Sequence, residues 1–421
     1  MSIQLYNGVK QKKSSFFSTQ TIVTIIIFTL VLGPFNNVWA KELQSTPQKW
    51  VGTWATAPQL VEPNNMPPAP GLTGNTLRQI VRVSVGGKKL RIKFSNEYSL
   101  APVTLKAVTI AVSAGGSAVK ESTNKALTFN GKQEVTMEPG SVMYSDGLVY
   151  DLKAGADMAI TISFGSTSPT ITGHPGSRTT SYLITGNNIA HSDFSQAVKT
   201  DHWYIINGIE VDQSKHKAAV AIIGDSITDG RGSGTNKQNR WPDVLAQKLL
   251  AEKKEIGVLN LGIGGNCVLR GGLGPTGLSR FNRDILQQNG VRWLIVLEGV
   301  NDIGGVRDSA AAVQVAEALI AAYSKIISQA HSRGIKVFGA TITPIKKSFY
   351  YTDCREKARN TVNEWIRTSG RFDATIDFDR VLSDPSNSST IIPEAQSGDY
   401  LHPNEVGYEM MGKSVKLSLF R

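Results

Sequence analysis

The sequence has few cysteines, a moderate share of charged residues and a mean hydropathy near zero. Two cysteines in 421 residues cannot build a disulfide framework, which excludes a small disulfide-stapled fold. A mean hydropathy of −0.14 excludes a membrane protein with many spans. With 40% hydrophobic and 19% charged residues, the composition is that of a globular protein and excludes disorder over most of the chain. The length predicts two domains.

Acidic residues are absent from positions 1–40. Three lysines there precede an apolar run at 22–32, and Val38 and Ala40 occupy the −3 and −1 positions of a cleavage site. This is the layout of a secretory signal peptide. The apolar run has 11 residues, against the roughly 20 that a membrane span needs. We therefore predict cleavage and a secreted or periplasmic protein without a stable membrane anchor; an uncleaved anchor is the alternative.

The positive charge is scattered rather than clustered. The formal net charge of +11 falls to +8 when residues 1–40 are removed, because they contain three lysines and no acid. Lys253 and Lys254 form a pair, not a tract, and Glu252 and Glu255 flank them. Zinc-finger spacing and an RNA-binding aromatic pattern are both missing. A basic exported protein is therefore favoured over a nucleic-acid-binding one.

The first half of the chain has the pattern of β-structure. Short runs rich in Val, Ile, Leu and Thr alternate with Gly, Asn, Ser and Pro clusters, which predicts an all-β sandwich or barrel. These runs lie at 79–85, 89–94, 103–112, 147–152 and 158–164. A polar joint near 205–216 predicts domains at 41–210 and 211–421.

Strands and helices alternate after residue 217, which predicts a parallel, doubly wound sheet. We expect strands at 218–223, 258–261, 293–297, 336–342 and 374–378, and helices at 241–250, 311–330, 358–366 and 406–419. Ligands of such sheets bind beyond the carboxyl ends of the strands.

Polar residues follow several of these strand ends. Ser226 comes directly after the first strand, a glycine-rich stretch at 262–265 follows the second, and Asn301 follows the third. Asp399 and His402 share a short loop before the last helix. Together they supply a hydroxyl, an imidazole, a carboxylate, main-chain N–H groups and a side-chain amide. This set is typical of acyl transfer through a serine nucleophile.

Each of these residues also has a structural interpretation. Ser226 could cap the next helix, and Asn301 could form a turn. A dinucleotide loop is excluded, because Cys267 occupies the place of the third glycine in G-x-G-x-x-G. The histidines and cysteines show no metal-ligand spacing, so we predict neither a cofactor nor a metal site. The α/β-hydrolase elbow G-x-S-x-G is also missing, since position 228 is Thr.

Four motifs in order carry a family resemblance: GDSITDG at 224–230, NLGIGGN at 260–266, GVND at 299–302 and DYLHPN at 399–404. With them, residues 217–421 resemble the SGNH, or GDSL, hydrolase superfamily. The resemblance implies a flavodoxin-like three-layer fold and ester hydrolysis. WVGTWA at 50–55 and NRWPD at 239–243 resemble a two-domain branch of arylesterases and acylhydrolases, some of them from xylan-degrading gene clusters.

The resemblance also implies roles for individual residues. Ser226 matches the nucleophile, His402 the general base and Asp399 the carboxylate that orients it. Gly265 and Asn301 match the main-chain and side-chain donors of the oxyanion hole, together with the Ser226 N–H. The substrate expected is a small ester or an acylated carbohydrate, with a short acyl group such as acetyl on a carbohydrate or aryl alcohol.

Two questions stay open at this point. A glycan-binding protein with a vestigial hydrolase domain, or an acyltransferase to sugar hydroxyls, would share much of this sequence. Cys267 and Cys354 both follow predicted strand ends, and in an exported protein they could form a disulfide or remain free thiols.

Overall fold

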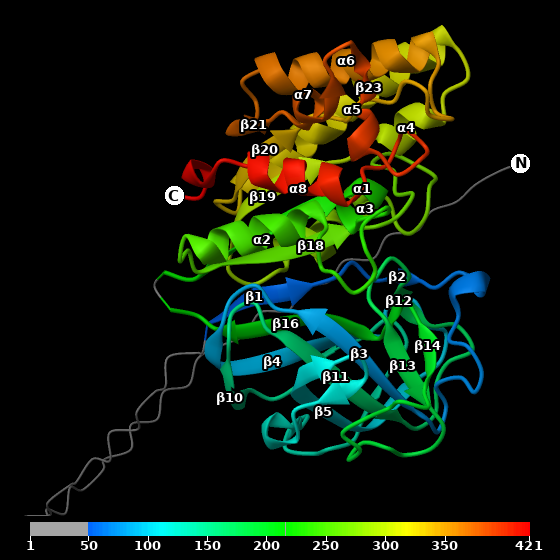
Figure 1. Ribbon diagram of the computed structural model, residues 1–421, viewed down its shortest axis with the longest axis vertical. Helices are drawn as coiled ribbons and strands as arrows, with labels where there is room; N and C mark the ends of the chain where they lie inside the picture. Colours follow the sequence, from blue (N-terminus) through cyan, green and yellow to red (C-terminus); the bar gives the residue numbers. More distant parts are fainter. Residues whose placement is uncertain (1–48, 215) are drawn as a thin grey trace, which may run out of the picture. The chain divides into compact units, whose positions relative to one another are not determined.

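The computed structural model describes residues 49–421 apart from residue 215, so the predicted signal peptide at 1–40 lies outside the described residues. The chain from Pro47 to Arg421 forms one compact unit. Within it, antiparallel β-structure up to Asp212 precedes alternating strands and helices from Ala218 (Figure 1). We call these two parts the β-region and the α/β-region. The predicted fold class, a parallel α/β domain preceded by an all-β domain, is confirmed.

The β-region is built from short antiparallel strands. They are β1 (Trp50–Ala55), β2 (Gln59–Leu60), β3 (Thr76–Arg82), β4 (Gly87–Ser95), β5 (Val103–Gly115), β6 (Ala118–Val119), β7 (Lys125–Ala126), β8 (Val135–Met137), β9 (Val142–Tyr144), β10 (Leu148–Leu152), β11 (Asp157–Phe164), β12 (Thr172–His174), β13 (Ser181–Ile184), β14 (Val198–Thr200), β15 (Trp203–Tyr204) and β16 (Ile206–Asp212). One sheet has the order β1-β16-β4-β10, a second β14-β13-β3-β11-β5-β6, and a third β15-β12-β2.

Side chains of the second sheet alternate between two apolar clusters. Leu77 and Val81 of β3 join the main core, whereas Ile80 between them packs in a smaller cluster with Tyr182 and Phe194. This alternation is the period of two expected for a strand with both faces covered. The last strand, β16, continues in the first sheet to Asp212.

The α/β-region has a five-stranded parallel sheet of order β18-β17-β19-β20-β21. Counted from the first strand of the region this is 2-1-3-4-5, the flavodoxin-like order, which changes direction between its first and third strands. Its strands are β17 (Ala218–Gly224), β18 (Ile256–Gly262), β19 (Val291–Leu297), β20 (Lys336–Ala340) and β21 (Ala374–Ile376), and its helices are α1 (Ser226–Asp229), α2 (Trp241–Ala251), α3 (Gly277–Phe281), α4 (Val300–Gly304), α5 (Ser309–His331), α6 (Asp353–Thr368), α7 (Phe378–Leu382) and α8 (Glu405–Ser414).

Two predicted helix bounds were wrong by five residues, and the others differ by at most two. The closing helix, expected at 406–419, ends at Ser414, because Val415 has extended backbone angles and a fully buried side chain. The Lys248 ammonium binds the carbonyl oxygens of Lys413 and Val415 and fixes this end. Helix α6 begins at Asp353, five residues before the predicted start at Ala358. The Thr352 hydroxyl caps it by accepting a hydrogen bond from the Arg355 N–H.

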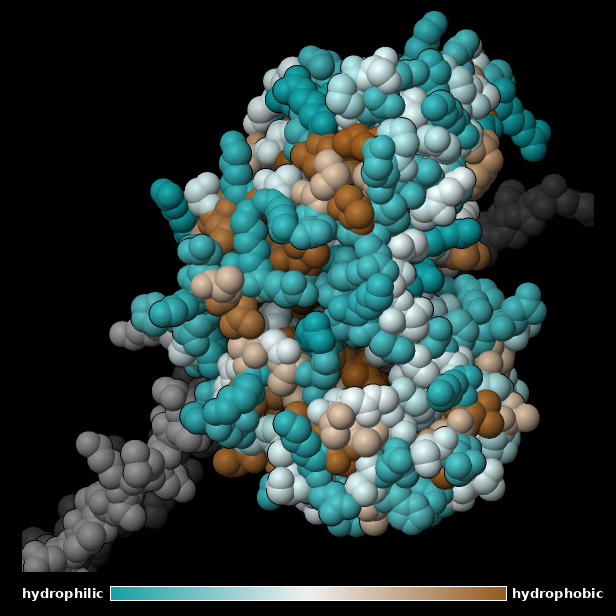
Figure 2. All heavy atoms as spheres, in the orientation of Figure 1, coloured by the Kyte–Doolittle hydropathy of each residue, from teal (hydrophilic) through white to brown (hydrophobic). Residues whose placement is uncertain are grey.

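Helix α5 is long and apolar enough to cross a membrane by length and composition. Its buried residues, among them Ala316, Leu319, Tyr323 and Ile326, belong to the core cluster of the protein. Its apolar stripe therefore packs against the protein core, as in an amphipathic helix. Hydrophilic residues cover most of the face drawn in Figure 2, and apolar residues lie between them in small groups.

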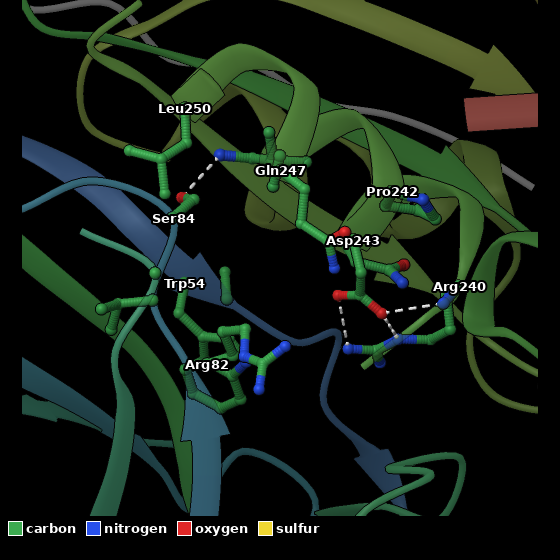
Figure 3. A pocket seen from close by; sticks show the side chains of 14 residues that line it. Trp54, Arg82, Ser84, Arg240, Pro242, Asp243, Gln247 and Leu250 are labelled. Atoms are coloured by element: carbon green, nitrogen blue, oxygen red, sulfur yellow. Dashed lines mark hydrogen bonds and ion pairs between the residues drawn. The ribbon is translucent and has the colours of Figure 1, made fainter. Parts of the chain in front are cut away.

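The two regions share one apolar core and touch along β1 and β18. A Cβ atom on Gly257 would lie 2.0 Å from the main-chain oxygen of Gly52, so glycine is required for this close approach. The Ser84 hydroxyl accepts a hydrogen bond from the Val258 N–H at 2.9 Å. Around the small pocket between these strands and α2, Arg240 and Asp243 form a two-pronged ion pair (Figure 3).

Candidate active site

Ser226 lies at the carboxyl end of β17, beside the point where the strand order changes direction. The Asp225 side chain accepts a hydrogen bond from the Ile227 N–H and starts the short helix α1. Gly230, with a φ of 103°, ends that helix after one turn. The cap of this helix is therefore Asp225, and the Ser226 hydroxyl is left for other contacts.

Ser226, His402 and Asp399 form a continuous hydrogen-bonded chain. The Ser226 Oγ lies 2.8 Å from His402 Nε2, and His402 Nδ1 lies 2.6 Å from Asp399 Oδ2. The second carboxylate oxygen of Asp399 accepts hydrogen bonds from the Leu401 and His402 N–H groups. Because a carboxylate can only accept, the neutral imidazole carries its proton on Nδ1, and Nε2 is free to accept from the serine hydroxyl.

Burial and hydrogen bonding act in opposite directions on this pair. Burial disfavours the Asp399 carboxylate, but hydrogen bonds from His402 and Leu401 outweigh it and lower its pKa to about 2. Burial lowers the pKa of His402, Asp399 opposes this, and the cations Arg231 and Arg178 add to the lowering. The imidazole is therefore neutral, and able to accept a proton, at neutral pH.

Gly265 and Asn301 lie beside Ser226 in the same cleft. Among the described residues, neither the Gly265 N–H nor the Ser226 N–H has a main-chain acceptor. The Asn301 amide donates one hydrogen bond to the Asn266 carbonyl, and its oxygen accepts from the Tyr350 hydroxyl at 2.9 Å. These two contacts fix the amide and leave its second N–H unused. All the predicted site residues thus line one cleft, except Asp399, which reaches it through His402.

Two clefts meet at this group of donors. The first, about 360 Å³, is lined by Ser226, His402 and polar residues of both regions. The second, about 840 Å³, is lined by Cys267, Leu269, Val306 and Val315, with α5 on one side. Gly265, Asn301 and Tyr350 line both clefts. A group held by these donors would lie where the two clefts meet.

Comparison with known families identifies the domain that carries this cleft. The model of the GDSL-like Lipase/Acylhydrolase family matches residues 222–410, from β17 to α8. These residues belong to the GDSL-like lipase/acylhydrolase family. The chain is therefore a carboxylic ester hydrolase. No curated protein sequence matches the chain.

Several solved structures resemble the GDSL domain. A lipase/acylhydrolase from Enterococcus faecalis is 20% identical, with 47% of this chain and 92% of that chain covered and a TM-score of 0.36. A variant of an acetyl xylan esterase from Geobacillus stearothermophilus is 18% identical, with 48% and 94% covered and a TM-score of 0.36. A GDSL-like lipase from Bacteroides thetaiotaomicron is 17% identical, with 49% and 90% covered and a TM-score of 0.37.

Arg280 organises the GDSL domain beneath the cleft and was not predicted. Its fully buried guanidinium binds the carbonyl oxygens of Gly224 and Leu261, at the ends of β17 and β18, and the carboxylate of Glu298 after β19. Burial raises the pKa of Glu298 well above its usual value, with Arg280 opposing the shift. The sequence gives little indication of this role, because an arginine on a short helix usually lies at the surface.

Asp302 holds a loop of the cleft, and the two cysteines are not bridged. Asp302 accepts hydrogen bonds from the Val268 and Leu269 N–H groups and so holds the loop after Gly265. Cys267 and Cys354 are both free, so the disulfide alternative is not realised. Burial and neighbouring acids raise the pKa of the Cys267 thiol to about 12, whereas Cys354 lies against the Thr352 hydroxyl in the first turn of α6.

The β-region also contributes to the cleft, and sequence reasoning missed its residues. Gln59, Glu62, Asn65, Arg178 and His202 all line the cleft around Ser226. They come from loops and strand ends scattered over the first half of the chain, with no shared motif. Among the described residues, no cluster of His, Cys, Asp or Glu is placed to hold a metal ion.

Proposed function

We propose that the chain is an exported serine esterase, with Ser226 as nucleophile, His402 as general base and Asp399 as the carboxylate that orients the base. The 2.8 Å contact between Ser226 Oγ and His402 Nε2 is the observation that carries this proposal. A serine hydroxyl becomes an effective nucleophile when a neighbouring base accepts its proton. Asp399 holds the imidazole in the tautomer that can accept and stabilises the imidazolium that forms.

The reaction has two halves. Ser226 Oγ attacks the ester carbonyl, its proton passes to His402 Nε2, and the alcohol then leaves with that proton. Water enters, His402 takes one of its protons, and the hydroxide attacks the acyl-serine. The bond to Ser226 Oγ then breaks, the His402 proton returns to that oxygen, and the acid leaves. In both halves the negative charge on the carbonyl oxygen is stabilised by the N–H groups of Ser226 and Gly265 and by the Asn301 amide. Among the described residues the Ser226 and Gly265 N–H groups have no main-chain acceptor, and the Asn301 amide, which gives one N–H to the Asn266 carbonyl, keeps its second; this and their place in one cleft support the role.

The proposed substrate has a short acyl group, such as acetyl, on a carbohydrate or aryl alcohol. The polar lining of the cleft around Ser226 supports an alcohol that carries hydroxyl groups. A panel of p-nitrophenyl esters from acetate to octanoate tests the acyl length, with the highest kcat/KM expected for acetate. Acetylated polysaccharides tested alongside, with product analysis, distinguish hydrolysis from transfer to a sugar hydroxyl.

Replacing the nucleophile tests the assignment. We expect Ser226→Ala to abolish hydrolysis of p-nitrophenyl acetate while the thermal unfolding midpoint stays close to that of wild type. Ser233→Ala, at a serine seven residues further along the chain, is a matched control. Unchanged turnover in Ser226→Ala would refute the role of Ser226, and glycan binding without any ester turnover by wild type would favour the vestigial alternative.

Export is tested separately on the full chain. Expression in a bacterial host should yield a protein outside the cytoplasm whose mass corresponds to a chain beginning at Lys41. A membrane-bound product that retains residues 1–40 would instead support an uncleaved anchor.

A further inference from the structure

The cleft around Ser226 has one wall from each region. Ser226, His402, Arg231 and Tyr350 line it from the α/β-region, and a group of polar residues lines it from the β-region. The β-region residues belong to β2 and the loop after it and to the segments after β12 and β14. In Figure 1, β2 and β12 lie at the side of the β-region that faces α1 and α3. The β-region is therefore part of the active-site cleft.

The most ordered part of this wall is a cluster of three side chains around Glu62. Gln59 Nε2 donates to one carboxylate oxygen at 2.6 Å, and Asn65 Nδ2 donates to the other at 3.0 Å. Each oxygen keeps a lone pair for a further donor. The cluster is rigid, because Gln59 is buried and pairs with Gly173 in the sheet, and the Asn65 carbonyl accepts a hydrogen bond from the buried Tyr204 hydroxyl.

A buried polar contact ties this wall to the nucleophile. His174 Nδ1 faces the Ala57 carbonyl at 2.9 Å, and its Nε2 faces Asp229 Oδ1 at 2.8 Å, three residues after Ser226. Both His174 and Asp229 are almost completely buried. Both ring nitrogens face oxygen acceptors, so the two hydrogen bonds need a proton on each nitrogen or one on Asp229. A Cβ on Gly176 would lie 1.8 Å from Asp229 Oδ2, so the wall meets the nucleophile helix in direct contact.

The chemistry of the cleft fits hydroxyl groups. Glu62 offers acceptors, and Arg178 and Arg231 offer donors, and a hydroxyl group uses both kinds. On the opposite wall, Phe349 is 69% exposed and its ring centroid lies 4.5 Å from that of Tyr350. The exposed Phe349 ring beside polar side chains provides an apolar face for a sugar ring and hydrogen-bonding groups for its hydroxyls.

The two clefts differ in their lining, and this difference indicates which cleft binds the acyl group and which binds the alcohol of the ester. Gly265 and Asn301 line both clefts, so a carbonyl bound to them lies where the two clefts meet. The second cleft is lined by Leu269, Val306 and Val315, which suit an acyl group. The polar cleft is left for the alcohol.

We propose that the β-region forms the alcohol-binding wall of the active site, and that Glu62, held by Gln59 and Asn65, binds hydroxyl groups of a carbohydrate ester opposite Phe349. This inference rests on the proposed serine esterase function. It assigns a substrate class, esters of hydroxyl-rich alcohols, to residues outside the GDSL domain.

The test compares two acetyl esters on the full chain: acetylated xylo-oligosaccharides and p-nitrophenyl acetate, whose alcohol has no free hydroxyl. For Glu62→Ala we expect the ratio of kcat/KM, oligosaccharide over p-nitrophenyl acetate, to fall about 10- to 100-fold, the loss typical of a hydrogen bond to a charged group. Phe349→Ala should lower the same ratio about 2- to 10-fold. The controls are Glu134→Ala, which breaks an exposed ion pair with Lys106, and Leu100→Ala, at a side chain that is 78% exposed.

The outcomes separate this inference from the proposed function. Unchanged ratios in both Glu62→Ala and Phe349→Ala, with p-nitrophenyl acetate turned over as expected, would overturn the alcohol-binding wall and leave the esterase intact. Absence of turnover in wild type with either ester would overturn the esterase and the wall with it. Glu62→Gln is the second variant if Glu62→Ala fails to fold. Calorimetry in the Ser226→Ala background should show weaker oligosaccharide binding when Glu62 is also replaced, and equal affinities would contradict the proposal.

Discussion

The α/β-region and the β-region both line the cleft around Ser226, but they reach it by different routes. In the α/β-region, Ser226, Gly265 and Asn301 stand at the ends of parallel strands, where the sheet itself brings them together. In the β-region, Glu62 and Arg178 lie on connections between antiparallel strands, and they reach the cleft through packing against the other region. The sheet topology places the α/β-region residues in the cleft, whereas packing between the two regions places the β-region residues there. On this account, the parallel sheet supplies the reacting groups and the antiparallel part supplies the surroundings of the alcohol.

The largest expected effect is on Asp399, the carboxylate of the α/β-region that we propose orients the base. Asp399→Asn should lower kcat for p-nitrophenyl acetate by about 10⁴-fold, because the amide no longer fixes the tautomer in which Nε2 accepts the serine proton. Steady-state kinetics measures it. Asp384→Asn, at a half-buried acid in the same region, is the control and should match wild type. A loss below tenfold in Asp399→Asn would mean that the carboxylate is not essential for orienting His402.

A second effect concerns the stability of the strand ends on which the α/β-region places its groups. Arg280→Met should lower the free energy of unfolding by about 3–5 kcal/mol, because it leaves the buried Glu298 carboxyl and the buried carbonyl oxygens of Gly224 and Leu261 without their donor, while Asp284 keeps its pair with Arg283. Urea denaturation followed by circular dichroism measures the change. Arg333→Met, at an exposed position, should have little effect. Equal stability of the two variants would show that the strand ends do not depend on this buried cation.

The oxyanion donors come next. Asn301→Ala should lower kcat by about 10²–10³-fold, the usual cost of one oxyanion donor. Tyr350→Phe keeps the amide but removes the hydroxyl that holds its oxygen, so its loss should be clearly smaller. A Tyr350→Phe loss as large as that of Asn301→Ala would place the hydroxyl, rather than the amide, on the developing charge.

The smallest expected effect tests whether a charge of the β-region changes the pKa of His402, the proposed base. Arg178 belongs to the β-region and Arg231 to the α/β-region, and both help to lower the pKa of His402. Either cation disfavours the imidazolium, so replacing it with Met should raise that pKa. In the pH profile of kcat/KM, activity falls at low pH because protonated His402 cannot act as a base. This fall should then occur at higher pH. If this pH shifts in Arg231→Met but not in Arg178→Met, only the cation of the α/β-region affects the pKa of His402.

The sequence allowed the α/β-region and its site to be predicted because both follow short-range rules. Strand patterns that alternate with helix patterns predicted a parallel sheet. In such a sheet the residues that follow the strands lie at one edge. Ser226 and Asn301 were placed at this edge in this way, and their roles, with that of His402, came from the resemblance to the SGNH hydrolases. Glu62, Arg178 and the contact between His174 and Asp229 were not, because they depend on how two regions pack, which local patterns do not encode. Arg280 was missed for a related reason: its partners are carbonyl groups, which any residue carries.

The end of the last helix and the start of α6 show the same limit on a smaller scale. Apolar spacing continues past Ser414, but Val415 is buried by tertiary packing and the backbone leaves the helix there. At α6 the capping residue Thr352 decides the start, five residues before the apolar spacing begins. In both cases the helix bound is set by a contact that the spacing of apolar residues in the sequence does not indicate.

The central claim is that the α/β-region supplies the nucleophile, and covalent labelling tests it most directly. The full chain is treated with a fluorophosphonate ester, digested and analysed by mass spectrometry. We predict a single phosphonylated site at Ser226, loss of esterase activity in proportion to labelling, and no labelling of Ser226→Ala. Full labelling at another serine, or unchanged labelling of Ser226→Ala, would contradict the account.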